Sequence, residues 1–123
     1  MINVWIIDDE ESIRTICISA LEDLFHVESF SSASEALLAL NSNKPDLIIT
    51  DIKMPGMSGL EFLNKVSDKF PDLPTIIITA HANIDNALSA YKGGAFEYLT
   101  KPFDINEIRA LAIKATKSSK PVD

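Results

Sequence analysis

Five short runs of apolar residues divide the chain at regular intervals. They cover residues 4–7, 27–30, 47–50, 75–79 and 96–100. The first, third and fourth runs consist almost entirely of Val, Ile, Leu and Trp, so their apolarity is continuous rather than alternating. Continuous apolarity is typical of strands that are covered on both faces, as in a parallel sheet between two layers of helices.

Between these runs, apolar residues recur at the spacing of one face of a helix. The spacing predicts helices over residues 13–24, 33–40, 60–70, 84–91 and 105–115. Ser32 and Asp104 are expected to cap two of these helices, and Gly93–Gly94 to end the fourth. Strict alternation of strands and helices predicts an α/β fold, a flavodoxin-like doubly wound (βα)5 domain with strand order 2-1-3-4-5. We assign residues 1–115 to this domain and the polar residues 116–123 to the start of a linker.

Composition narrows the class of protein and its partners. The chain has 123 residues, of which 46% are hydrophobic and 24% charged, as expected for one globular domain. Its 18 acidic and 11 basic residues give a net charge of -7, which disfavours direct binding to nucleic acid or to a membrane surface. Cys17 is the single cysteine, so no internal disulfide is expected. The start of the chain does not resemble a signal peptide, and we expect a cytoplasmic protein.

Polar residues follow the predicted strands at the edge where doubly wound folds bind their ligands. Asp8 and Asp9 follow the first strand, Asp51 follows the third, Thr79 ends the fourth and Lys101 follows the fifth. Converging carboxylates repel one another unless a cation joins them, and oxygen ligands of this kind suit Mg²⁺. A hydroxyl and an ammonium can hold phosphoryl oxygens, and a carboxylate can be the nucleophile. The set therefore predicts phosphoryl transfer to an aspartate.

Each of these residues also has a purely structural explanation. Acidic residues before a helix complement its dipole, and Asp51 could form a turn. Thr79 could be an ordinary strand residue, and Lys101 a solvated surface lysine. What favours a site is their joint occurrence at the ends of different strands.

Two other functional classes compete with this interpretation. A phosphatase of the haloacid-dehalogenase type needs a second carboxylate two residues after its nucleophile, where this chain has Lys53. A flavodoxin would offer hydroxyls and amides to a phosphate after the first strand, whereas Asp8 and Asp9 would repel it.

The motifs resemble the response-regulator receiver family of two-component signalling. The matching segments are IIDDE at 6–10, TDIKMPG at 50–56, ITA at 78–80 and YLTKPF at 98–103. The segments TAH at 79–81, AYKGGAFEYL at 90–99 and KPFD at 101–104 are similar to receivers of the nitrogen-regulation type. Those receivers head enhancer-binding activators of transcription that carry an AAA+ ATPase and a DNA-binding domain downstream.

The resemblance implies a role for each matching residue of the metal and phosphoryl site. Asp51 is expected to be the phosphoacceptor for a histidine kinase. Asp9 and Asp51 are expected to bind Mg²⁺ together with the backbone carbonyl of Lys53, while Asp8 acts mostly through water. Thr79 is expected to hold the phosphoryl oxygens together with Lys101.

The resemblance also implies how the site is read out. Tyr98 is expected to be a switch aromatic, and the Lys101–Pro102 peptide bond is expected to be cis. The fourth helix and fifth strand are expected to form the output surface, which would control transcription through an output domain. The resemblance allows a dimer on phosphorylation and implies no enzymatic activity beyond the domain's own phosphorylation and dephosphorylation. Alternatives are a stand-alone receiver acting by protein contact and a pseudo-receiver, against which the intact acceptor set argues.

Overall fold

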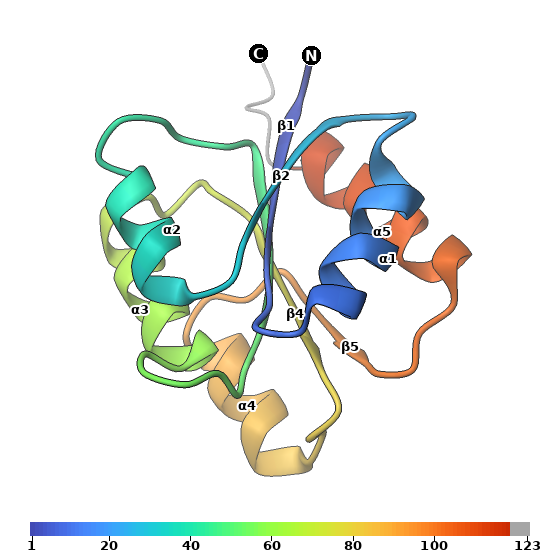
Figure 1. The fold of residues 1–123 in the computed structure, drawn as a ribbon. Helices are drawn as coiled ribbons and strands as arrows, with labels where there is room; N and C mark the ends of the chain where they lie inside the picture. Colours follow the sequence, from blue (N-terminus) through green and yellow to red (C-terminus); the bar gives the residue numbers. More distant parts are fainter. Residues whose placement is uncertain (119–123) are drawn as a thin grey trace.

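The computed structural model describes residues 1–118 and contains a five-stranded parallel sheet covered on both faces by helices (Figure 1). The strands are β1 (Asn3–Ile7), β2 (His26–Phe30), β3 (Leu47–Asp51), β4 (Thr75–Thr79) and β5 (Glu97–Thr100). Their order is β2-β1-β3-β4-β5, and every neighbouring pair is parallel. The predicted fold class and strand order are therefore confirmed.

Five helices connect the strands and form the two outer layers. They are α1 (Glu11–Leu21), α2 (Ala33–Ala39), α3 (Gly59–Lys69), α4 (Ile84–Lys92) and α5 (Ile105–Ser118). Helices α1 and α5 cover one face, and α2, α3 and α4 cover the other (Figure 1). Successive β1 residues alternate between these layers, since Val4 and Ile6 pack with α1 and α5 while Trp5 and Ile7 pack with α2 and α3. This double coverage explains why the central strands are apolar at nearly every position.

The helix ends follow the predicted capping chemistry. The Ser32 side chain accepts a hydrogen bond from the Glu35 N–H at 3.2 Å, at the start of α2. Asp104 Oδ1 accepts one from the Asn106 N–H at 2.7 Å, at the start of α5. Helix α4 ends before Gly94, whose φ of +104° is a conformation that glycine adopts without strain.

The first helix is shorter than the sequence predicts, because it ends at Leu21 instead of residue 24. The backbone N–H groups of Leu24 and Phe25 both donate to the Leu21 carbonyl, which closes a turn. This turn places Phe25 in the core and leaves Leu24 38% exposed. Helical spacing alone could not distinguish such a turn from one more turn of helix.

The last helix is longer than predicted. It continues to Ser118, past the boundary that we expected at residue 115, and Thr116 is buried. Residues 119–123 lie outside the described residues, so the linker assignment stays a prediction. Within residues 1–118, no helix has the length and hydropathy needed to cross a bilayer.

Candidate functional site

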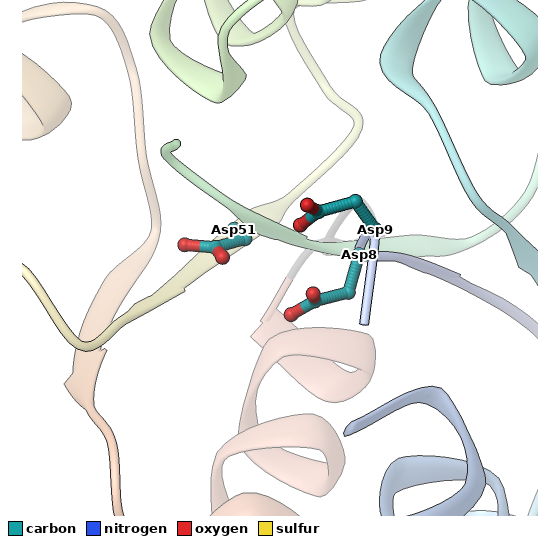
Figure 2. Close-up of side chains that lie close together, drawn as sticks. All are labelled: Asp8, Asp9 and Asp51. Atoms are coloured by element: carbon teal, nitrogen blue, oxygen red, sulfur yellow. The ribbon is translucent and has the colours of Figure 1, made fainter. Parts of the chain in front are cut away.

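Three carboxylates meet at the carboxyl ends of the two central strands. Asp8 and Asp9 follow β1 directly, and Asp51 is the last residue of the neighbouring strand β3. One oxygen of each lies within 4.8 Å of the others. Figure 2 shows the three carboxyl groups gathered in this space. Asp8 and Asp51 are buried and Asp9 is exposed, so two negative charges are withdrawn from water and need compensation.

Lys101 supplies part of this compensation. Its Nζ lies 2.8 Å from Asp8 Oδ2, 3.1 Å from Asp51 Oδ2 and 3.6 Å from the Glu10 carboxylate. Burial alone would lower the pKa of Lys101, but the hydrogen bonds and charges of Asp8 and Asp51 raise it overall. The ammonium therefore stays charged, and it balances only one of the clustered negative charges.

The backbone around Lys101 fixes its position. Its N–H donates to the Thr79 carbonyl at 2.8 Å, which continues the pairing of β4 with β5. The following Lys101–Pro102 peptide bond is cis, as the family resemblance implied.

Asp8 is held from several sides. Its Oδ1 accepts the Glu10 N–H at 2.9 Å, and Arg14 Nη1 donates to its backbone carbonyl at 2.8 Å. Burial, the largest influence, raises the pKa of the Asp8 carboxyl, and the hydrogen bonds from Lys101 and the Glu10 N–H offset this only in part. A bound cation would favour the ionised form of Asp8.

The two oxygens of Asp51 have different surroundings. Oδ1 accepts the N–H of Ile52 at 2.7 Å, while Oδ2 faces Lys101. The backbone behind Asp51 is equally constrained, because a β-carbon at Gly59 would overlap the Asp51 carbonyl oxygen. Gly59 can therefore start α3 directly against the strand end, with its N–H donating to the Ile52 carbonyl at 2.7 Å.

Thr79 completes the edge beside Asp51. The register pairs Asp51 with Ile78, so Thr79 is one residue further along β4. Its side chain is fully buried, and its hydroxyl accepts the His81 N–H at 3.0 Å. A hydroxyl that accepts one hydrogen bond keeps its own hydrogen for another acceptor. Thr79 thus has a donor available at the predicted position.

Tyr98 lies on β5, in register with Ile77 of β4. Its hydroxyl is buried and has no hydrogen bond of good geometry within residues 1–118. Burial raises the pKa of Tyr98, and the nearby backbone of Asn83 lowers it only in part. A buried hydroxyl without a hydrogen-bond partner costs about 1–3 kcal/mol. A different position of the Tyr98 ring would therefore be favoured if it gave the hydroxyl a hydrogen-bond partner.

Most site residues named from the sequence are thus brought together, and two supporting residues were missed. Arg14 and Gly59 act through the backbone of Asp8 and Asp51, and no sequence pattern singled them out. Lys53 is exposed in the loop after β3, and the role of its carbonyl stays a prediction.

Fold and site together define a doubly wound α/β domain with a lysine-bridged acidic site at the carboxyl ends of its strands. The family model described as the response regulator receiver domain matches residues 4–113. The chain belongs to this family. The membership sets aside the phosphatase and flavodoxin alternatives.

Individual relatives narrow the similarity. The DNA-binding transcriptional regulator NtrC of Escherichia coli (strain K12) is 47% identical over 113 residues, which are 91% of this chain and 24% of the regulator. The solution structure of the apo receiver domain of nitrogen regulatory protein C matches with a TM-score of 0.85 at 46% identity, over 94% of each chain. A CheY-like receiver domain protein from Methanospirillum hungatei JF-1 matches with a TM-score of 0.93 at 26% identity, over 97% of this chain and 96% of that one.

These findings confirm the resemblance to receivers of the nitrogen-regulation type. The chain spans about a quarter of the length of the NtrC regulators that it matches.

Proposed function

We propose that this receiver domain takes a phosphoryl group from a histidine kinase onto Asp51, with Mg²⁺ at the acidic cluster. The observation that supports this most is the approach of Asp8, Asp9 and Asp51 to within 4.8 Å, with Lys101 bridging two of them. Carboxylate oxygens beside a future phosphoryl group are the donors that Mg²⁺ prefers. We assign Asp9, Asp51 and the Lys53 carbonyl as direct ligands and Asp8 as a ligand through water.

In the proposed reaction an Asp51 carboxylate oxygen attacks the phosphorus of a phosphohistidine. A phosphorus–oxygen bond forms, the phosphorus–nitrogen bond breaks, and the electron pair returns to the imidazole nitrogen. When bound, Mg²⁺ would neutralise charge on the carboxylates and on the transferring oxygens. The Ile52 N–H orients the Asp51 carboxylate, Lys101 offers an ammonium to a phosphoryl oxygen, and Thr79 offers its hydroxyl hydrogen. The domain would thus promote its own phosphorylation and dephosphorylation only.

We propose that α4 and β5 form the output surface. Ala90 is the one buried residue of α4, and such a lightly packed helix belongs to the low end of local stability. Ile84, Leu88 and Tyr91 are 77%, 52% and 47% exposed and follow each other at helical spacing, so they form one apolar stripe. Movement of Thr79 toward the phosphoryl group would bias the adjoining loop and this helix.

Similar regulators extend beyond the receiver and bear the name of DNA-binding transcriptional regulators. We therefore propose an AAA+ and DNA-binding output for the protein to which this receiver belongs. A stand-alone receiver that acts by protein contact is the alternative.

Incubation with acetyl phosphate and Mg²⁺, followed by intact-mass measurement, tests the acceptor. One added phosphoryl group is expected, and it should be lost in Asp51→Asn and when EDTA replaces Mg²⁺. Asp85→Asn, an exposed change on α4, is the matched control and should still be phosphorylated. An adduct that persists in Asp51→Asn would show that the acceptor lies elsewhere.

The output surface has a separate test. Adding BeF₃⁻ and Mg²⁺ to ¹⁵N-labelled protein should shift the amide signals of residues 82–98 more than those of α2. Unchanged signals over residues 82–98 would refute the proposed surface while leaving the acceptor assignment intact.

A further inference from the structure

A groove lies between α2 and α3. These two helices are on the face of the sheet opposite α1 and α5 (Figure 1). It encloses about 510 Å³, within the range of ligand and peptide sites. Its apolar lining consists of Leu37, Leu38, Leu40 and Met57. The groove belongs neither to the acidic site nor to the exposed stripe of α4.

Leu38 is the unusual member of this lining. Its side chain is 70% exposed, although Leu40 two residues later is buried and Leu37 is partly buried against the core. Exposed Leu38 therefore extends the apolar surface of the groove outward to its rim. A ligand that filled only the floor would leave Leu38 in water, whereas a helix laid along the groove would cover it. Met57 adds a flexible side chain that can adapt to an incoming surface.

The charged part of the rim is basic. Lys65 and Lys69 are one turn apart on α3 and both line the groove. Neither forms an ion pair with any of residues 1–118. The Lys69 ammonium lies 3.4 Å from Asn41 Oδ1 and 5.8 Å from the centre of the Phe70 ring, and neither partner carries a charge. No acidic side chain within the described part of the chain lines the groove. In a protein with a net charge of -7, this local positive charge favours acidic partners.

We propose that the groove between α2 and α3 binds an amphipathic helix of a partner protein, in which acidic side chains flank the apolar stripe. The partner's apolar side chains would contact Leu37, Leu38 and Met57, and its carboxylates would pair with Lys65 and Lys69. This contact requires no phosphoryl group and leaves the α4 stripe free. The domain would thus offer a second docking surface beside its output surface.

The test uses two designed peptides of about 18 residues, which is five helical turns. Both carry leucines at positions i, i+3, i+4 and i+7, but glutamates flank the stripe in one and lysines in the other. Each is titrated into the ¹⁵N-labelled full chain without phosphodonor. The acidic peptide is expected to shift the amide signals of the groove residues, and to bind at least about tenfold more tightly than the basic one.

Variants then assign the contact to named side chains. Leu38→Ser is expected to weaken binding of the acidic peptide. Lys65→Glu combined with Lys69→Glu should make the domain prefer the basic peptide over the acidic one. Lys117→Glu makes the charge change of one of these two substitutions on α5, on the opposite face, and should leave binding unchanged. Circular dichroism and the urea midpoint of each variant establish that it is folded, which is expected because all these positions are exposed.

Several results would overturn the proposal. Equal binding of both peptides, or shifts centred on α4 and β5, would show that the groove does not select an acidic helix. If decanoate bound in a way that required Lys65 and Lys69 while the acidic peptide did not bind, the groove would be a site for small amphipathic anions. A concentration-dependent dimer in sedimentation that Leu38→Ser abolishes would assign the groove to a second copy of the chain.

Discussion

In metal-free solution at neutral pH, replacing Asp8 by asparagine is expected to stabilise the domain. The Asp8 side chain is fully buried and shares its small space with Asp9 and Asp51. Asparagine has nearly the same shape, and its single side-chain oxygen can still accept the Glu10 N–H, while its amide nitrogen replaces the oxygen that faces Lys101. The substitution therefore removes the Asp8 charge together with its ion pair to Lys101.

The size of the effect follows from the distances around Asp8. Two unit charges 4.8 Å apart repel by about 3.5 kcal/mol at an effective dielectric constant of about 20. Asp51 exerts at least this repulsion on Asp8, and the exposed Asp9 adds a weaker one. The attraction of Lys101 at 2.8 Å is about 6 kcal/mol on the same scale, so the pairwise terms nearly cancel. The cost of withdrawing the Asp8 charge from water then remains, and we expect a gain of about 1–2 kcal/mol for Asp8→Asn.

The pH dependence of this gain has a definite sign. Because the folded state raises the pKa of Asp8 above 3.8, the protonated carboxyl is the form that folding favours. The stabilisation that the protonated Asp8 carboxyl contributes is fully present below the pKa of Asp8 in the unfolded chain, and it is lost as the pH rises through the raised pKa of the folded state. The stability advantage of Asp8→Asn over the natural chain should therefore be largest at neutral pH and smallest in acid.

Urea denaturation followed by circular dichroism measures this difference, with EDTA present and at several pH values. Asp72→Asn, at an exposed position, is the control and should change stability little at any pH. Adding Mg²⁺ should stabilise the natural chain more than Asp8→Asn. If Asp8→Asn is less stable than the natural chain in EDTA at neutral pH, then the attraction of Lys101 for Asp8 exceeds the repulsion and burial cost of the Asp8 charge, and the reasoning is refuted.

Three further outcomes follow from buried groups. Gly59→Ala should lower the free energy of unfolding by about 3 kcal/mol in urea denaturation, because the new β-carbon would overlap the Asp51 carbonyl. Gly56→Ala should lower it by only about 1 kcal/mol, because Gly56 has a φ of +80° but open space around it. Cys17, whose pKa burial raises to about 12, should react with a thiol reagent no faster than the domain unfolds, and fast labelling of the native protein would contradict its burial. Tyr98→Phe should leave the free energy of unfolding unchanged or raise it by up to about 1 kcal/mol in the same assay, because the hydroxyl has no well-formed hydrogen bond within residues 1–118 to lose. A clear loss of stability would show that the hydroxyl does form such a bond.

The fold was predictable because β3 and β4 are covered on both faces. Every residue of these two strands is buried and three of the five residues in each are Leu or Ile, so their sequences cannot be mistaken for surface segments. The edge strand β2 has no fully buried residue, and its prediction depended on its spacing between helices. Parallel strands place their carboxyl ends at one edge, and this geometry alone brought Asp8, Asp51 and Thr79 together in the prediction.

The details of the site could not be predicted in the same way. Whether Lys101 points to solvent or into the acidic cluster depends on how β5 and the following loop are placed, which local sequence does not determine. The same limit applies to exposed apolar residues. Leu88 follows helical spacing as well as buried leucines do, and only the packing of neighbouring elements shows that it is exposed.

The two ends of α4 are attached in different ways, and this difference gives the proposed switch a direction. At the carboxyl end, Ser67 Oγ of α3 donates to the Gly93 carbonyl at 2.8 Å, and any β-carbon at Gly94 would collide with Ser67. At the amino end, the Asn86 side-chain amide donates a hydrogen bond to the His81 carbonyl in the loop after β4, at 2.9 Å, and this bond is exposed. Because His81 also donates its N–H to the Thr79 hydroxyl, a movement of Thr79 acts on the weakly held end. A closely packed end and a loosely tied one make a pivot, so α4 is expected to swing about Gly93 rather than unfold or shift as a whole.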